Sequence, residues 1–239
     1  MVVLKSRWEY RRASRNALLT PERRADLLHG WCRRGLDAIA IRLTLEGTPP
    51  RSGMLVSNHL SYLDILVFSA ALPCAFVSKE EVRRWPVFGR FAEYSGTVFV
   101  RRNKTGDAYR ANETIIDYLN RGVAVVLFPE GTTTDGSHVL RFHSTMLHPA
   151  INTGAWVTPC AIRYELSDGD PAEEICWWGD MAILPHLFNL IGKRVIRAII
   201  SFGAPVPAAG DRKALSEILH DQVAALHSGQ VAVPVGNAL

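Results

Sequence analysis

Residues 54–68 read MLVSNHLSYLDILVF, two apolar runs joined by a short polar stretch. The first run has the length of a buried strand, and the second, over residues 61–72, has the length of a helix. Between them lie Asn58 and His59, with Asp64 five positions after the histidine. A buried strand that leads directly into a helix is typical of an α/β domain, and it brings polar side chains together at the carboxyl end of the strand.

Short apolar runs alternate with helical patterns along the rest of the chain. We expect strands at residues 53–58, 74–79, 97–102, 123–131, 157–164 and 197–206, and helices at 61–72, 106–122 and 211–227. Gly122 closes the middle helix, a common position for glycine. The pattern predicts a single α/β domain with a central, mostly parallel or mixed sheet flanked by helices.

The length of the chain and its cysteines bound the class of protein. At 239 residues and 48% apolar content, the chain is long enough for one sizeable core, and no linker-like tract divides it. The four cysteines show no CxxC spacing, and no secretory leader pattern opens the sequence. We therefore expect a protein of the reducing cytoplasm, with residues 1–45 as an N-terminal helical segment and residues 46–239 as the main domain.

The basic charge of the protein is concentrated at its N-terminus. Residues 1–36 hold nine Lys/Arg against three Asp/Glu, a surplus of six, while the whole chain carries +4. Apolar residues in this region follow helical spacing, away from most of the arginines: Leu27, Leu28, Trp31, Cys32, Leu36 and Ile39. Two interpretations stay open. The segment is either a surface helix packed on the core or an interfacial helix whose arginines meet anionic lipid.

No segment of the sequence predicts a transmembrane helix, which needs about 20 mostly apolar residues. Residues 65–78 are free of Asp, Glu, Lys and Arg but are too short and contain Pro73, and polar residues and prolines interrupt residues 142–162. No recognisable nucleic-acid-binding module accompanies the basic N-terminus. We therefore expect no nucleic-acid partner, and we expect any contact with a membrane to be at its surface.

The interval between His59 and Asp64 suggests a functional pair. Ser61 is placed to act as an N-cap, with Asp64 at the third helical position, where the positive helix end favours a carboxylate. A turn before this helix would fold the imidazole back onto the carboxylate. The carboxylate would then fix the tautomer and leave the other ring nitrogen as a base toward an approaching hydroxyl. A simple capping role explains Asp64 as well, so this pair alone does not decide the function.

Three further stretches place polar groups at strand ends. Residues 96–102 (GTVFVRR) end in two arginines, which suit a phosphate or another anion. Residues 128–136 (FPEGTTTDG) turn sharply after a buried strand and offer Glu130, hydroxyl groups and backbone N–H groups to a polar substrate. Residues 157–162 (VTPCAI) start another strand, with Pro159 at its edge.

Together, these four stretches resemble the four ordered blocks of the glycerophospholipid acyltransferase family, the lysophospholipid acyltransferases, including its bacterial PlsC-like members. There the pattern is N-H-x4-D, then G-x-x-F-[IV]-x-R, then F-P-E-G-T, then a block with a proline. The resemblance spans residues 50–165, and residues 177–187 (WWGDMAILPHL) and 199–206 (IISFGAPV) resemble the later part of bacterial members. It implies a glycerol-3-phosphate acyltransferase-like fold, with residues 46–239 as the acyltransferase domain.

The resemblance also implies roles for individual residues. His59 would be the general base that takes the proton from the acceptor hydroxyl, and Asp64 would orient it and stabilise the imidazolium. Asn58 would support the turn. Arg102, helped by Arg101, would bind the anionic head of the acceptor. The residues implied around the acceptor pocket are Glu130, Gly131, Thr132 and Thr133. Pro159 would lie on the acyl-donor side.

The reaction implied is acyl transfer from acyl-CoA or acyl carrier protein to a lysolipid hydroxyl, in phospholipid or ornithine-lipid biosynthesis. A positioned base lets the hydroxyl attack the thioester carbonyl directly, so no covalent enzyme intermediate is required. No cofactor or metal is implied; the partners are the lysolipid, the acyl donor and a membrane surface. Because the acceptor lies in a bilayer, this resemblance favours the interfacial interpretation of the N-terminal helix. We expect a peripheral protein on the cytoplasmic face of the inner membrane.

One position departs from the family pattern. Many lysophosphatidate-specific relatives read E-G-T-R in the third block, where Thr133 stands here. One anion-binding guanidinium is therefore missing. This absence favours an acceptor with less phosphate charge, such as a lyso-ornithine lipid or a lysophospholipid, unless Arg101 or Arg141 compensates.

Two other functions stay open, a thioesterase or hydrolase that uses the same pair to activate water and a non-catalytic lipid-binding protein. The sequence lacks the G-x-S-x-G elbow of serine hydrolases, the P-loop and the H-E-x-x-H zinc signature. His138, His143 and His148 recur every five residues, so they share neither a helix face nor a strand face. Cys160 stands in an apolar strand, which is typical of a core residue.

Overall fold

The computed structural model of the protein describes residues 19–85, 88–101 and 105–230. In chain order, its elements are α2 (Pro21–Ala38), β1 (Ile41–Glu46), β2 (Met54–Ser57), α3 (Leu63–Ala71), β3 (Cys74–Lys79), the 3₁₀ helix η1 (Glu80–Arg84), α4 (Phe88–Tyr94), β4 (Val98–Val100), α5 (Thr105–Asn120), β5 (Ala124–Leu127), the 3₁₀ helix η2 (Ser144–Leu147), α6 (His148–Thr153), β6 (Trp156–Leu166), α7 (Pro171–Glu174), α8 (Ile183–Ile191), β7 (Ile196–Phe202), β8 (Val206–Pro207) and α9 (Arg212–His227). The expected strands and helices are present, whereas α4, α6, α7, α8 and the strand β1 were not expected, and the expected strand at 197–206 is divided into β7 and β8.

A single sheet of eight strands runs through the protein in the order β1-β7-β6-β2-β5-β3-β4, with β8 paired to β6. β6 runs antiparallel to β7 and β8, and β6, β2, β5, β3 and β4 pair in parallel. The predicted central mixed sheet is therefore confirmed. Parallel neighbours need crossover connections, and α3 and α5 supply two of them. As a result, the carboxyl ends of β2, β5, β3 and β4 meet at one edge of the sheet.

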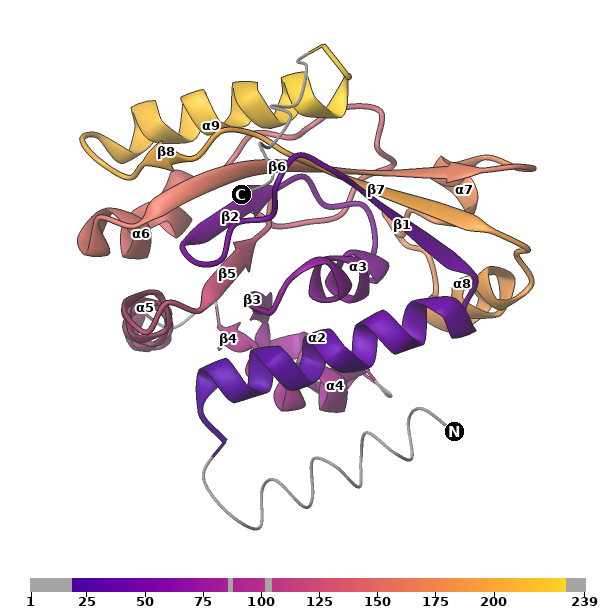
Figure 1. Ribbon diagram of the computed structural model, residues 1–239, viewed down its shortest axis with the longest axis horizontal. Helices are drawn as coiled ribbons and strands as arrows, with labels where there is room; N and C mark the ends of the chain where they lie inside the picture. The colour runs from indigo at the N-terminus through magenta and orange to yellow at the C-terminus, as the bar shows by residue number, and fades with distance from the viewer. Residues whose placement is uncertain (1–18, 86–87, 102–104, 231–239) are drawn as a thin grey trace.

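Helices cover both faces of the sheet (Figure 1). Leu55 and Val126 belong to a core cluster with α2 and α3, while Val56 and Leu127 belong to a second cluster with α5, α6 and α9. This division follows from the alternation of side chains along each strand. β2 and β5 are buried on both faces, which explains why each reads as a continuous apolar run.

Helix α2 packs its apolar stripe on the domain. Leu28 and Leu36 lie in the same core cluster as α3, and β1, which follows α2 directly, pairs with β7 in the main sheet. For residues 21–38, the structure shows the surface helix packed on the core, so these buried side chains are not available to lipid. Residue 45, the expected end of the N-terminal segment, lies within β1, and the division of the chain there stays a prediction. The remaining residues of the segment, 1–18, lie outside the described part of the chain.

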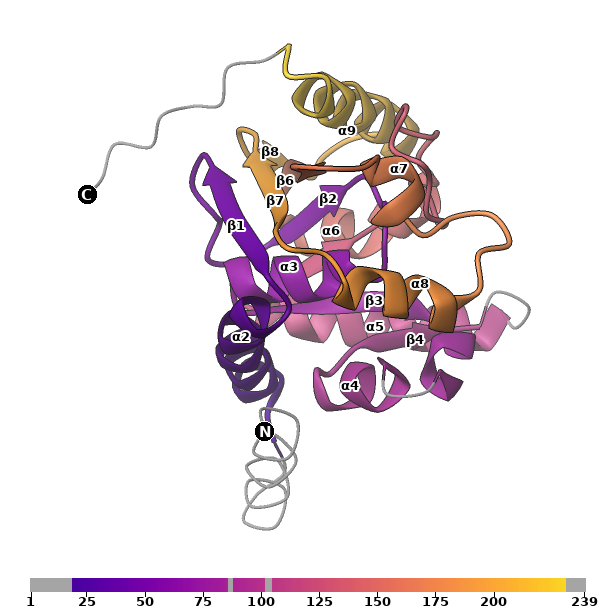
Figure 2. The same ribbon diagram turned by 90° about the vertical axis from the view of Figure 1, so that its right-hand side faces the viewer.

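The connection from β6 to β7 carries α7 and α8, which face the viewer in Figure 2. None of the helices in the described part of the chain has the length and apolarity needed to cross a membrane. All four cysteines are buried and free of disulfide bonds, and Cys160 is a core residue as its strand predicted.

Candidate active site

The candidate site lies where β2 and β5 end side by side. Val56 pairs with Leu127 in the sheet, so the residues that follow each strand meet at the same edge. There the His59 ring stacks on the Phe128 ring, with centroids 4.0 Å apart and planes at 12°. Phe128 is buried, and 20% of the His59 side chain is exposed. The stack therefore fixes one face of the imidazole and leaves part of the ring accessible.

His59 and Asp64 are in contact, as their spacing predicted. The Nδ1 atom of His59 lies 2.8 Å from Oδ2 of Asp64, whose side chain is fully buried. A carboxylate only accepts hydrogen bonds, so this contact assigns the ring proton to Nδ1 and the lone pair to Nε2. Nε2 forms no hydrogen bond within the described residues. It is the ring nitrogen available to a substrate.

Three further donors hold the Asp64 carboxylate. The backbone N–H groups of Leu60 and Ser61 donate to Oδ2 at 2.8 and 3.1 Å, and the Tyr164 hydroxyl donates to Oδ1 at 2.7 Å. Burial and the nearby carboxylate hold the pKa of Tyr164 well above its usual value, so its hydroxyl keeps the proton that it donates. A buried charge is tolerated when it is hydrogen-bonded in this way.

The predicted N-cap role of Ser61 is wrong. Helix α3 begins at Leu63 without a side-chain cap, and the Ser61 hydroxyl is buried without a hydrogen bond to any described residue. Instead, Asp64 reaches back from the first turn to the N–H groups before the helix, as in a capping box. One carboxylate thus caps the turn and orients the imidazole of His59, so the two explanations of Asp64 that the sequence left open hold together.

Asn58 ties the turn to β6. Its Oδ1 accepts from the Ile162 N–H at 2.8 Å, and its Nδ2 donates to the Ile162 carbonyl at 3.0 Å. Just beyond the end of β2, the buried Asn58 side chain thus makes the two hydrogen bonds to β6 that the backbone of a neighbouring strand would make. These two hydrogen bonds anchor the turn, which is the role predicted for Asn58. They also engage the amide with the protein, so that it is not directed at a substrate.

Glu130 points into the protein and clamps two backbone N–H groups. Its Oε1 accepts from the N–H of His59 at 2.9 Å, and its Oε2 accepts from the N–H of Leu140 at 3.0 Å. The side chain is only 4% exposed, and burial raises its pKa to about 7 against the opposing effect of these two donors. Glu130 therefore shapes the site through the backbone that carries the imidazole.

The loop after β5 is joined to the His59 turn by a backbone hydrogen bond. Gly131 has a φ of 70°, a conformation that favours glycine, and its N–H closes a turn on the carbonyl three residues earlier at 3.1 Å. The Thr134 N–H donates to the His59 carbonyl at 3.0 Å. Thr132 is exposed and Thr133 is half-buried, so both lie on the outer side of this loop.

The two predicted anion-binding arginines stand at the end of β4. Arg101 is 53% exposed, and its Nε lies 3.4 Å from Oδ2 of Asp107. β4 is three strands away from β2, a distance of about 14 Å at the usual spacing between strands. Arg102 lies outside the described residues. The structure thus places Arg101 at the same edge as His59 but well along the sheet.

Pro159 lies inside β6, not at its edge as predicted. The strand begins at Trp156, and Pro159 pairs with Val56 of β2. On the other edge of β6, Trp156 and Val157 pair with β8, and the residues from Cys160 onward pair with β7. Pro159 falls between these two sets, so its missing N–H interrupts neither row of backbone hydrogen bonds. Its carbonyl accepts from the Gly203 N–H at 2.8 Å.

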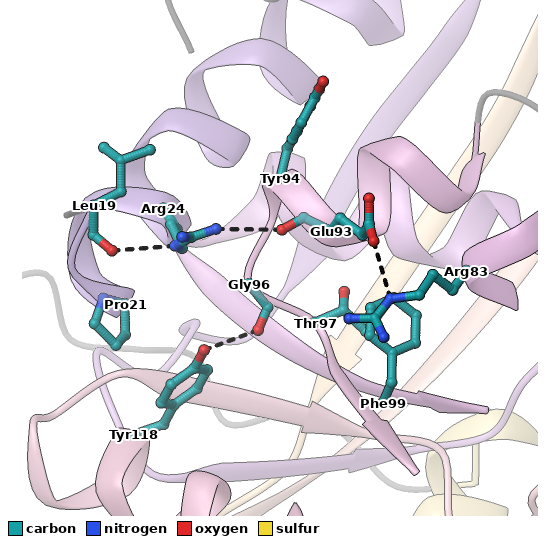
Figure 3. Close-up of a pocket in the computed structure, with 10 residues that line it drawn as sticks. All are labelled: Leu19, Pro21, Arg24, Arg83, Glu93, Tyr94, Gly96, Thr97, Phe99 and Tyr118. Atoms are coloured by element: carbon teal, nitrogen blue, oxygen red, sulfur yellow. Dashed lines mark hydrogen bonds and ion pairs between the residues drawn. The ribbon is translucent and has the colours of Figure 1, made fainter. Parts of the chain in front are cut away.

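A cavity of about 510 Å³ opens beside β4, between the start of α2, η1 and α5 (Figure 3). None of the predicted site residues lines it. Its two guanidinium groups are engaged with protein: Arg24 donates to the carbonyls of Leu19 and Glu93, and Arg83 pairs with the Glu93 carboxylate. We therefore locate the chemistry at the hydrogen-bonded pair beside Phe128 rather than in this cavity.

Tyr164 is a site residue that sequence reasoning missed. It lies 100 positions after Asp64, in a strand recognised only by its apolar pattern. Alternation along β6 places it on the same face as Ile162, in the core cluster that contains α3. The available signal was chemical, because a tyrosine on the core face of a strand needs a partner for its hydroxyl.

Within the residues that the structure describes, no three His, Cys, Asp or Glu side chains converge to hold a metal ion. The arrangement instead presents an oriented imidazole, a buried carboxylate behind it and one open ring nitrogen. Such a pair is able to take a proton from a hydroxyl group placed against Nε2.

Comparisons with known proteins point in the same direction. The Acyltransferase family model matches residues 41–163, which include His59, Asp64, Glu130 and Pro159. The chain is 38% identical over 200 residues to the lyso-ornithine lipid O-acyltransferase of Pseudomonas aeruginosa, covering 83% of this chain and 76% of that protein. It is 30% identical over 220 residues to the 1-acyl-sn-glycerol-3-phosphate acyltransferase of Neisseria meningitidis serogroup B, covering 90% and 86%.

The fold has a solved counterpart. The crystal structure of the 1-acyl-sn-glycerophosphate acyltransferase PlsC from Thermotoga maritima matches with a TM-score of 0.61 over 90% of this chain and 81% of that one, at 23% identity. This likeness concerns the fold. With the family model and the relatives, it establishes that the chain belongs to the acyltransferase family, among its PlsC-like members.

Proposed function

We propose that the protein transfers a fatty acyl group from acyl-CoA or acyl carrier protein to a hydroxyl of a lysolipid, with His59 as the general base. The observation that carries this proposal is the 2.8 Å contact between Nδ1 of His59 and Oδ2 of Asp64, which leaves Nε2 open. A positioned base of this kind contributes roughly 10²–10⁴-fold to the rate of such a reaction.

The steps follow from this geometry. The acceptor hydroxyl lies against Nε2 and attacks the thioester carbonyl as its proton passes to Nε2. The Asp64 carboxylate balances the charge of the imidazolium. Collapse of the tetrahedral intermediate breaks the carbon–sulfur bond, and the departing thiolate takes the proton back from the ring. The products are the acylated lipid and the free thiol, and His59 returns to its starting state.

The acceptor that we favour carries less phosphate charge than lysophosphatidate. The Pseudomonas relative is named for lyso-ornithine lipid, and Thr133 stands where lysophosphatidate-specific relatives have arginine. Arg101 stands at about 14 Å along the sheet from the strand of His59 and is paired with Asp107. Arg141 is exposed and follows Leu140, whose N–H binds Glu130. We therefore propose lyso-ornithine lipid as the preferred acceptor.

The test is thiol release with acyl-CoA or acyl carrier protein as donor and vesicles that contain lyso-ornithine lipid, lysophosphatidate or lysophosphatidylethanolamine. Lipid products are identified by mass spectrometry. We expect acceptor-dependent release that is lost in His59→Ala and kept in His148→Ala, a matched control on α6 whose histidine is exposed. Release without acceptor supports a thioesterase instead, and a clear preference for lysophosphatidate refutes the proposed acceptor.

We also propose that the protein works peripherally on the cytoplasmic face of the inner membrane. Acyl-CoA and acyl carrier protein are water-soluble donors of the cytoplasm, whereas the acceptor is an amphiphile of the bilayer. Fractionation of cells tests this proposal. We expect part of the protein in the membrane fraction and its release by high salt or carbonate; retention after both washes contradicts peripheral binding.

A further inference from the structure

Helix α8 exposes an apolar face to solvent. Leu184 is 56% exposed and Phe188 is 73% exposed, and their separation of four residues places them on one side of the helix. Residues 181–192, MAILPHLFNLIG, contain no Asp, Glu, Lys or Arg. Figure 2 shows α8 across the near face of the protein, in front of the sheet. Exposing such a pair to water is unfavourable, so this face suits an apolar partner.

The buried side of α8 is fastened to the turn of the candidate site. His186 accepts from the Tyr62 hydroxyl at 2.9 Å and donates through its other ring nitrogen to the Cys176 carbonyl at 3.1 Å. Tyr62 belongs to the turn that carries the general base and its carboxylate. Just before α8, the Trp177 N–H donates to the Leu60 carbonyl of the same turn at 2.8 Å. The exposed face of α8 is therefore separated from the backbone of this turn by the width of the helix and the length of the Tyr62 side chain.

A second copy of the chain is a poor fit for this face. Burial of one aromatic side chain removes about 150–250 Å² from water, so Leu184 and Phe188 together offer no more than about 300 Å². Stable interfaces between proteins bury about 800 Å² on each partner. A bilayer, in contrast, accepts a few apolar side chains into its headgroup boundary without further complementary surface.

The residues that flank α8 match a lipid surface in polarity on one side and in charge on the other; Asp180, exposed before the helix, is the carboxylate that such a surface would have to leave in water. Trp177 and Trp178 precede the helix, half-buried, with their indole N–H groups bonded to backbone carbonyls, and tryptophan is enriched at membrane boundaries. Lys193 and Arg194 follow it. Lys193 pairs with Glu174, and Arg194 is exposed, so a cation stands beside the apolar face where it would meet anionic headgroups.

We propose that Leu184 and Phe188 on α8 dock the protein on the anionic bilayer surface that holds its acceptor lipid. This proposal rests on the proposed function, because that function places the acceptor in a bilayer. The apolar stripe of α2, which the sequence offered for this role, is buried against α3. Docking through α8 places the lipid surface on the far side of the helix that is hydrogen-bonded to the His59 turn through Tyr62, so that a lysolipid would enter from the membrane beside this turn.

The double variant Leu184→Ser/Phe188→Ser tests this proposal. Its binding to phosphatidylglycerol vesicles is measured by sedimentation against wild type and against Ile218→Ser, a control whose isoleucine is 50% exposed on α9, on the opposite face of the sheet. Losing two inserted apolar side chains should lower the vesicle partition constant at least about tenfold. Ile218→Ser should bind as wild type does. Phe188→Trp keeps an aromatic side chain there and should also bind normally.

Two further readouts separate this proposal from the function on which it rests. With a short-chain lysolipid below its micelle concentration, the double variant should match wild type in activity, whereas with vesicle-embedded acceptor it should lose about tenfold. Equal vesicle binding by wild type and the double variant overturns the docking proposal, and so does a dimer that only wild type forms in gel filtration. Weak vesicle binding by Phe188→Trp overturns it too. If no acceptor is acylated by any variant while the binding difference persists, the proposed function fails and the docking surface stands.

Discussion

Because Glu130 is buried, the stability of the folded protein should depend on pH. Its carboxyl group is 4% exposed, and burial raises its pKa from 4.5 to about 7. Between these two pH values, the folded protein holds the proton more tightly than the unfolded chain does. The stability from this group is therefore fully present below pH 4.5 and is lost as the pH rises through 7. Above pH 7, the folded protein contains a buried carboxylate that the N–H groups of His59 and Leu140 compensate in part.

The variant Glu130→Gln removes this dependence, because an amide does not titrate. A rise in pKa from 4.5 to about 7 corresponds to about 3 kcal/mol of stability. Wild type should therefore lose about 2.5–3 kcal/mol relative to the variant between pH 5 and pH 8, which is about 5–12 °C in Tm for a chain of this size. At pH 5 the variant should be the less stable protein, since its NH₂ group faces one of the two N–H donors at a cost of about 1–3 kcal/mol.

The assay is urea unfolding of wild type, Glu130→Gln and Glu113→Gln at four pH values from 5 to 8. Glu113 is an exposed residue of α5 and controls for the loss of one surface charge. The expected result is that the free energy of unfolding of wild type minus that of Glu130→Gln falls by about 2.5–3 kcal/mol from pH 5 to pH 8, and changes sign wherever the advantage of wild type at pH 5 is smaller than this fall, with no such trend for Glu113→Gln. A difference that stays constant within about 0.5 kcal/mol refutes the reasoning, because it means that the two N–H donors outweigh burial and keep Glu130 ionised throughout.

Asp64→Asn should lower kcat about 10²–10⁴-fold with little change in KM, because the amide oxygen stays on the N–H groups of Leu60 and Ser61 and no negative charge remains to balance the imidazolium; a loss below tenfold in the thiol-release assay contradicts this role of Asp64. Tyr164→Phe removes the 2.7 Å hydrogen bond to the carboxylate and should lower the free energy of unfolding by about 1.5–3 kcal/mol and kcat severalfold, whereas Tyr109→Phe, at an exposed tyrosine, should change neither. Gly136→Ala should destabilise the protein by about 1–3 kcal/mol in urea unfolding, because its φ is 84° and a Cβ there meets a leucine of the His59 turn at 3.3 Å; wild-type stability counts against this account.

The parts of the fold that sequence reasoning predicted are those in which one local pattern has one structural solution. β2 and β5 are buried on both faces, so their continuous apolar runs identify them as strands without knowledge of their neighbours. The contact between His59 and Asp64 was also predictable, because both residues lie within one turn and the helix end favours a carboxylate there. The absence of a cap from Ser61 was not predictable, since Asp64 satisfies the N–H groups of Leu60 and Ser61 before the helix whether or not the serine hydroxyl caps the helix itself.

Contacts between distant segments were outside the reach of sequence patterns. Tyr164 meets Asp64 only because β6 lies beside β2 in the sheet, and strand order is a property of the whole fold. The same limit applies to Glu130, whose position in the sequence places it in a turn after β5 but does not say that it binds the backbone of His59. In both cases, a polar side chain in the core finds its partner on another strand or turn, and this partner is set by the sheet.

Helices α2 and α8 show why the face that meets lipid is difficult to predict from hydrophobic periodicity. α2 has a clear apolar stripe, and the family resemblance favoured membrane binding over packing on the core, yet that stripe fills the space over α3. α8 is apolar on nearly every side, a pattern that usually indicates a buried helix, yet it lies at the margin of the fold. Among its side chains that the structure describes, the buried ones are His186 and Leu190. A helix that is apolar all round must leave one face unburied when it sits at an edge. The exposure of Leu184 and Phe188 is therefore a consequence of tertiary placement, and it falls beside the turn at which a lipid acceptor would have to arrive.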